Sequence, residues 1–197
     1  MIQADIPLFP LNTVLFPGGF KKLRLFEPRY TKMLSACLKQ DKPFGICLIR
    51  EGSETDASAT TYEMGTLINV IDWNMGKDGV LNLVVQGSKR FRILEEQLNA
   101  DQLLCASIET IEIEESRPVT SDHFKLVDTY KKLSGVIETA AEYDKQEHDA
   151  TWLGFRLAEL LPIRLSQKQY FLQLFDSYDR LDGLSELMDQ MDPNAIA

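Results

Sequence analysis

Short apolar runs and alternating apolar and polar residues dominate the chain from Met1 to about Glu115. Val80–Gln86 (VLNLVVQ) and Phe44–Ile49 (FGICLI) are rich in branched and aromatic residues, and Cys105–Glu114 sets isoleucines among polar neighbours. These patterns are typical of β-strands, because side chains of a strand point alternately to its two faces. This part of the chain is therefore predicted to be mainly β-structure.

Glycine and proline mark where these strands begin, bend and end. Met64–Trp73 is predicted to be a strand, and the turn Asn74–Gly79 (NMGKDG) folds it back into Val80 as a hairpin. Gly87–Lys89 is interpreted as a bulge. The polar stretch Glu51–Thr61 is predicted to be a surface loop.

One short helix interrupts the predicted strands. Phe20–Phe26 (FKKLRLF) has the composition of an extended segment, and it leads into Pro28, a residue suited to the first turn of a helix. The apolar residues that follow recur with helical spacing: Met33, Leu34, Cys37 and Leu38. The sequence therefore predicts a strand that runs directly into a helix.

From Ser121 onward the apolar residues recur in steps of three and four, which is the pattern of one helix face. Trp152–Leu161 continues the pattern up to Pro162, and Ser166 with Gln169 is interpreted as a capping box for the next helix. Other apolar positions of these predicted helices are Leu126, Tyr130, Leu133, Ile137, Ala140, Leu181, Leu184 and Met188. The second half is predicted to be a small helical bundle.

The fold class that follows is α+β, with a mainly antiparallel β-domain over residues 1–117 and a helical subdomain over 118–197. The linker is predicted at Glu115–Thr120, which contains Pro118.

A net charge of −9 makes nucleic acids and anionic membranes unfavourable partners, because the molecule as a whole repels phosphate backbones and anionic lipids. Two basic clusters on predicted strands remain candidates for an anionic ligand, although solvation of an exposed strand face is the favoured interpretation. The clusters are Lys21, Lys22 and Arg24, and Lys89, Arg90 and Arg92. Nucleic acid is therefore not an expected partner.

The cysteines and the hydropathy pattern indicate a cytoplasmic protein. Cys37, Cys47 and Cys105 are widely spaced in apolar stretches, as buried reduced thiols are. Neither a signal peptide nor an apolar run long enough to span a membrane is evident.

Candidate chemistry is scarce. His123 and His148 are the only histidines, and surface or capping roles are the favoured interpretation for both. The acidic row Asp176, Asp179 and Asp182 is interpreted as a solvated helix face. Zinc-ligand spacing, a calcium loop, a phosphate-binding loop and a GxSxG motif are all missing from the sequence. We therefore expect no catalytic residues, cofactor or metal, and a hydrolase with a Cys–His or carboxylate pair is a minor alternative.

The ordered proline and glycine motifs resemble the Lon N-terminal domain family. The resemblance is carried by IPLFPL from Ile6, VLFPGG from Val14, LRLFEPRY from Leu23 and VVQGSKRF from Val84. In the helical half, RLAELLP from Arg156 is similar to the bundle of short bacterial members.

The resemblance implies a PUA-like β pseudo-barrel followed by helices, and a non-catalytic role in recognising polypeptides. Expected partners are polypeptide substrates, or a protease that acts with this protein. The candidate binding residues are Phe26, Glu27, Pro28, Arg29, Tyr30 and Arg90. The alternative is an RNA- or nucleotide-binding PUA-like protein, which would use Lys89, Arg90 and Arg92.

Overall fold

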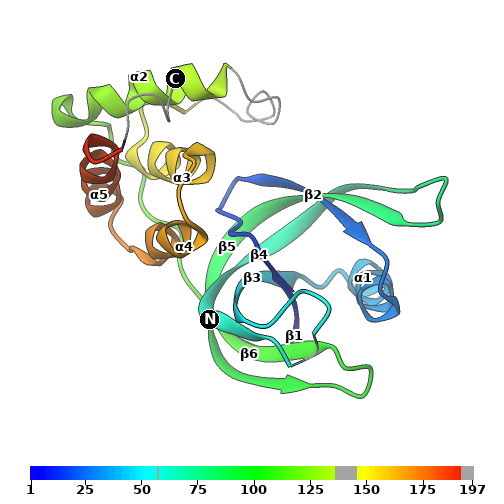
Figure 1. The fold of residues 1–197 in the computed structure, drawn as a ribbon. Coiled ribbons are helices and arrows are strands. Elements are labelled where there is room, and N and C mark those ends of the chain that lie inside the picture. The colour runs from blue at the N-terminus through cyan, green and yellow to red at the C-terminus, as the bar shows by residue number, and fades with distance from the viewer. Residues whose placement is uncertain (57, 136–145, 192–197) are drawn as a thin grey trace. The chain divides into compact units, whose positions relative to one another are not determined.

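The computed structural model describes residues 1–56, 58–135 and 146–191, and its contacts form two compact units, Met1–Glu112 and Ile113–Ala197 (Figure 1). The predicted boundary after residue 117 stays a prediction. Residues 113–117 belong with the helical unit by their contacts, because Glu114 and Arg117 form ion pairs with residues of that unit.

The first unit is built on one six-stranded sheet of order β2-β5-β4-β3-β1-β6, in which β6 also pairs with β5. This second pairing closes five strands into a barrel and leaves β2 attached to β5 alone. Only β1 and β3 are parallel, so the mainly antiparallel α+β fold is confirmed. The strands are β1 (Ile2–Leu11), β2 (Phe20–Leu25), β3 (Phe44–Glu51), β4 (Thr60–Met75), β5 (Leu81–Leu98) and β6 (Leu104–Thr110).

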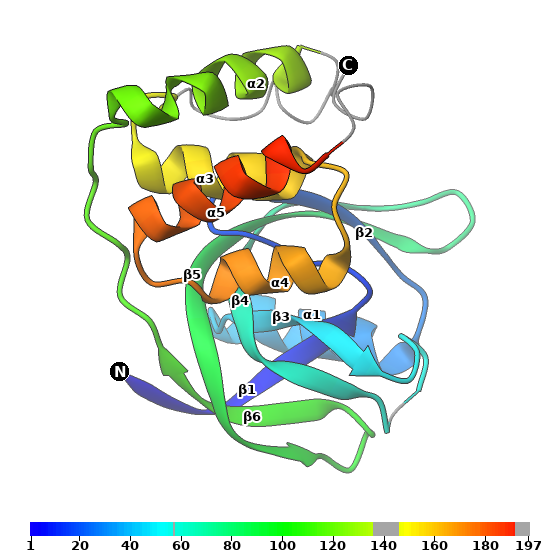
Figure 2. The same ribbon diagram turned by 60° about the vertical axis from the view of Figure 1, so that its left-hand side comes forward.

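Strand β5 makes this arrangement possible because its two halves have different neighbours. Its first half pairs with β2, and its second half, from Phe91, pairs with β6 (Figure 2). The register against β4 shifts between the pair Thr66–Arg90 and the pair Ile68–Gly87. The predicted bulge at Gly87 is therefore confirmed, as is the β4–β5 hairpin, whose turn contains Gly79 at φ 77°.

The sequence does not predict β1, because Pro7 and Pro10 lie inside it and proline argues against a strand. Pro7 lies opposite Cys105 of β6, and Pro10 lies opposite Cys47 of β3. Proline is compatible with a strand wherever its missing N–H would not belong to a ladder. Tertiary pairing on both sides therefore overrides the local signal.

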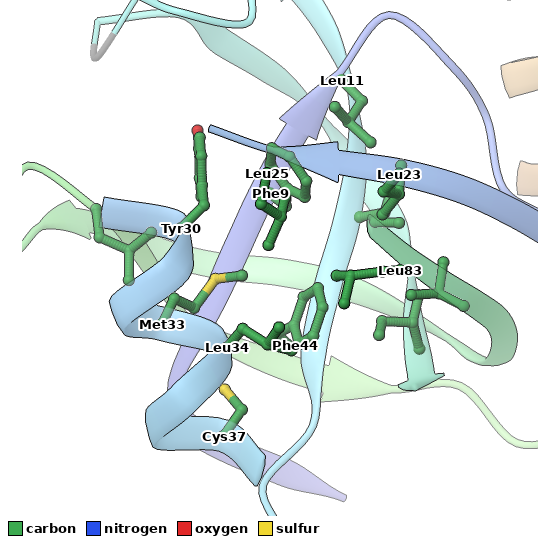
Figure 3. Close-up of a cluster of buried hydrophobic side chains, with 14 of the residues drawn as sticks. Phe9, Leu11, Leu23, Leu25, Tyr30, Met33, Leu34, Cys37, Phe44 and Leu83 are labelled. Atoms are coloured by element: carbon green, nitrogen blue, oxygen red, sulfur yellow. The ribbon is translucent and has the colours of Figure 1, made fainter. Parts of the chain in front are cut away.

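Each face of the sheet carries its own apolar cluster. Neighbours Ile46 and Cys47 of β3 belong to different clusters, as alternation along a strand requires. Helix α1 (Pro28–Gln40) packs against one face through Tyr30, Met33, Leu34 and Cys37, which point toward Phe9 and Phe44 in Figure 3. The helix begins at Pro28 as predicted.

The second unit contains α2 (Phe124–Ser134), α3 (Ala150–Leu160), α4 (Leu165–Gln173) and α5 (Ser177–Asp189), preceded by a 3-10 turn at Ser121–His123. Helix α3 contacts each of the other three helices. The predicted apolar positions Ile137 and Ala140 lie outside the described residues. The predicted capping box is wrong: helix α4 begins earlier, and the side chain of Gln167 accepts a hydrogen bond from the Arg164 N–H at 3.1 Å.

The acidic row is the predicted solvated face only in part: Asp179 and Asp182 are exposed, whereas Asp176 is half-buried and precedes α5 as its N-cap residue. Asp176 caps α5 by accepting hydrogen bonds from the N–H groups of Tyr178 and Asp179, and it forms an ion pair with Arg117 at 2.8 Å. Asp182 contacts the buried ring of His123 at 2.7 Å. These carboxylates hold α5 to the segment that precedes α2.

Candidate polypeptide-binding site

A pocket of about 310 Å³ lies beside β2, at the seam between this strand, the end of β1 and the start of α1. The predicted residues Phe26, Glu27 and Tyr30 line it. Its other lining residues are Phe9, Leu11, Asn12, Thr13, Lys21, Lys22, Leu23, Arg24, Leu25 and Glu54.

The floor of the pocket is apolar and belongs to the protein core. Phe9 and Tyr30 are in ring contact with their centroids 4.2 Å apart, and Leu23 and Leu25 are buried beside them (Figure 3). The floor is therefore rigid, because these side chains are fixed by the same cluster that holds α1 on the sheet.

Phe26 lies at the rim of the pocket and is 67% exposed, against 55% for the next most exposed aromatic side chains of the described residues. Of the two candidate aromatic residues, Tyr30 is buried and Phe26 is not. The neighbouring Leu25 enters the core, and strand alternation directs Phe26 away from it. An exposed ring next to an apolar floor is a feature of binding surfaces.

Arg29 fixes the start of α1 and the loops beside it. Its Nε atom lies 3.0 Å from Glu27 Oε2, and its guanidinium donates to the carbonyl oxygens of Gln102 at 3.1 Å and Glu54 at 3.4 Å. The guanidinium also lies over the ring of Tyr30, 4.7 Å from its centroid. Arg29 is only 11% exposed in its side chain, so it positions the site more than it offers a contact to a ligand.

Arg90 stands apart from the other predicted residues. It is buried on β5, opposite Thr66, and it does not line the pocket beside β2. Its assignment as a binding residue stays a prediction, and the site built here does not include it.

The basic residues of β2 lie beside the pocket, although their sequence pattern favours a solvated strand face. Lys21, Lys22 and Arg24 all line the pocket. Lys21 Nζ donates to Thr13 Oγ1 at 3.4 Å, and Arg24 forms an exposed ion pair with Asp78 at 2.5 Å. The sequence shows three basic residues within one predicted strand, but only the fold shows that they lie beside a pocket.

The cysteines and His123, which were the candidates for catalysis, are buried within the fold. Burial raises the pKa of the thiols of Cys37, Cys47 and Cys105, which favours unreactive thiols. His123 is buried rather than on the surface, and its ring contacts Thr120 Oγ1 at 2.9 Å and Asp182. Within residues 1–56, 58–135 and 146–191, His, Cys, Asp and Glu side chains form no group of three that could hold a metal ion.

Burial raises the pKa of Tyr30 to about 12, while the adjacent Arg29 acts in the opposite direction. Unfolded tyrosine ionises near pH 10, so the folded state holds this proton where the unfolded state has lost it. We expect the protein to lose on the order of 2 kcal/mol of stability between pH 10 and pH 12 through this residue. Urea unfolding across this pH range measures the effect, and Tyr30→Phe should show a smaller loss. An equal loss in both proteins contradicts the assignment.

No helix within the described part of the chain is long and apolar enough to cross a membrane.

The sequence matches a family model, the ATP-dependent protease La (LON) substrate-binding domain, over residues 5–190. Lon protease 2 of Myxococcus xanthus is 27% identical over 199 residues, covering 96% of this chain and 24% of the relative. The Lon protease of Anaeromyxobacter dehalogenans is 33% identical over 114 residues, which cover 13% of its length. The chain thus spans about a quarter or less of these relatives.

Two solved structures share the fold. A Lon N-terminal domain protein from Xanthomonas campestris is 30% identical with a TM-score of 0.80, and the match covers 96% of this chain and all of that one. The N-terminal domain of the Mycobacterium avium complex Lon protease has a TM-score of 0.63 at 17% identity, covering 92% of this chain and 96% of that one. The second likeness concerns the fold alone.

Proposed function

The chain belongs to the family of Lon substrate-binding domains, and we propose that it recognises polypeptides in the pocket beside β2 without catalysing a reaction itself. The single observation that carries this proposal is the exposed ring of Phe26 above an apolar floor. Unfolded polypeptides present apolar side chains, and a fixed apolar pocket with an aromatic rim is suited to bind them.

The surroundings of the site support recognition rather than chemistry. Residues of β1, β2 and α1 line most of the pocket, and loop residues complete it; the charged groups at its rim include Glu27, which is paired with Arg29. The proposed partners are polypeptide substrates, including those passed to a separate protease, in the cytoplasm.

Phe26→Ser tests this proposal. We expect the variant to bind a permanently unfolded protein about tenfold more weakly than the native chain, because an aromatic anchor at the rim contributes on the order of 1–2 kcal/mol. Isothermal titration calorimetry with reduced, alkylated lactalbumin measures this affinity.

Phe124→Ser is the matched control, since Phe124 is 55% exposed and lies outside the pocket. It should leave the affinity unchanged. Equal binding by both variants would place the contact elsewhere, and the absence of saturable binding by the folded native chain would end the proposal.

A further inference from the structure

The free edge of β2 determines what form of polypeptide fits this site. Among the strands that the structure describes, β2 pairs only with β5. In an antiparallel ladder every second residue directs its N–H and C=O away from the partner strand, so half of the β2 backbone groups face the open edge. Such an edge is able to accept another extended strand.

The end of β1 leaves room beside this edge. Strand β6 pairs with β1 only as far as Pro7, whereas the register with β3 continues to Leu11. Phe9 and Leu11 therefore lie on a stretch of β1 without β6, and both line the pocket together with β2 residues. The seam is open between these two strands.

The positive charge of β2 favours a bound polypeptide segment with acidic side chains. Strand β2 carries Lys21, Lys22 and Arg24 and no acidic residue, in a chain of net charge −9. Two carboxylates also line the pocket, but Glu27 is paired with Arg29, and Glu54 Oε1 accepts a hydrogen bond from the Asn12 N–H at 2.8 Å. Arg24 is paired with Asp78, whereas Lys21 and Lys22 form no ion pair with another described residue, so the edge keeps two cationic side chains for an incoming carboxylate.

Asp78 already displays the contact that a ligand would make. Its carboxylate lies 2.5 Å from Arg24 in an exposed ion pair, in which the side chains are 52% and 65% accessible. A carboxylate of a bound segment is able to replace an exposed partner of this kind at little cost, because such pairs are weak in water.

We infer that the open edge of β2 binds an extended polypeptide segment with acidic side chains as an added strand, with its carboxylates beside Lys22 and Arg24. The inference rests on the proposed function, and it names the class of substrate and the mode of binding. Backbone pairing makes the site tolerant of sequence, whereas the lysines and the arginine supply the preference for acidic segments.

Fluorescence anisotropy with labelled peptides of about ten residues tests the inference, since this length spans one strand. The probes are a peptide that alternates Glu and Val, the same peptide with Gln in place of Glu, and the Glu peptide with alternate backbone nitrogens methylated. We expect the Glu peptide to bind about tenfold more tightly than the Gln peptide, with an advantage that falls as salt is added. The methylated peptide should lose binding, because it has lost strand-pairing N–H groups.

Variants of the chain separate this site from general charge effects. The double variant Lys22→Glu with Arg24→Glu should lose the preference for Glu over Gln, whereas Asp78→Asn should strengthen it by freeing Arg24. Lys89→Glu is the matched control, because Lys89 is basic and half-exposed on β5 but outside the pocket.

Equal affinity for the Glu and Gln peptides would overturn the inference, and the lysines would then serve to protect the edge from aggregation. Undiminished binding of the methylated peptide would also overturn it, as would tighter binding of a single-stranded RNA than of the Glu peptide. None of these results decides the proposed function, because the calorimetric titration with unfolded protein tests that function separately.

Discussion

Replacing Arg180 with alanine is expected to lower the free energy of unfolding of the helical unit by about 3–5 kcal/mol. Arg180 is fully buried and donates to both carboxylate oxygens of Glu114, at 2.9 and 2.5 Å, and to the carbonyl oxygens of Phe171 and Leu174. Its guanidinium also lies 4.0 Å from the centroid of the Phe155 ring. Truncation removes all of these contacts and leaves the carboxylate of Glu114, only 9% exposed, without its arginine. Urea unfolding followed by far-ultraviolet circular dichroism measures the loss.

Lys125→Ala is the control for the Arg180 variant. Lys125 forms an ion pair with Asp189 at 2.5 Å, but both side chains are more than 60% exposed. Such a pair contributes at most about 1 kcal/mol. If the two alanine variants lose similar amounts of stability, burial of the Arg180 ion pair is not what holds this unit together.

Gly87→Ala is expected to destabilise the β unit by about 2–3 kcal/mol and to abolish binding at the β2 edge. A Cβ atom at residue 87 would overlap the carbonyl oxygen of Phe16, a backbone atom that has little freedom to move. Gly87 also exchanges backbone hydrogen bonds of 2.8 Å with Gly18 and Gly19, which set the start of β2. The overlap therefore displaces the strand that carries the proposed site. Thermal unfolding and the peptide titration measure the two effects.

Gly135→Ala controls for the loss of a glycine. Its Cβ would meet only ordinary contacts at 3.6 Å, and the backbone there is already helical with φ −69°. This substitution should be neutral or stabilise by up to about 1 kcal/mol. Unchanged stability and peptide binding in Gly87→Ala would contradict the close approach at Phe16.

Local patterns were sufficient for most elements. Pro28 and the spacing of Met33, Leu34 and Cys37 predicted α1, and the turn before Val80 predicted the hairpin of β4 and β5. These signals are local, because a turn or an amphipathic helix depends on residues close in sequence. Strand β1 was missed because its prolines oppose a local strand signal that pairing with distant strands overrides.

The sequence led to part of the lining of the pocket beside β2, and the binding role of these residues stays a prediction. The motif LRLFEPRY led to Phe26, Glu27 and Tyr30, which do line one pocket, but it gave no reason to add Lys22 or Arg24. It also grouped Arg90 with them, although Arg90 lies on a different strand and outside that pocket. A linear motif does not reveal which residues meet across a sheet.

By itself, the sequence determined the α+β class, the order of most elements and the family, because these depend on periodicity and on motifs along the chain. Only the tertiary structure decided that β5 shares its two halves between β2 and β6, which closes the barrel and leaves β2 with one open edge. Only the tertiary structure also made Arg180 a buried partner of Glu114. Strand pairing and burial join residues far apart in sequence, and their free energy depends on the whole packed chain rather than on any local pattern.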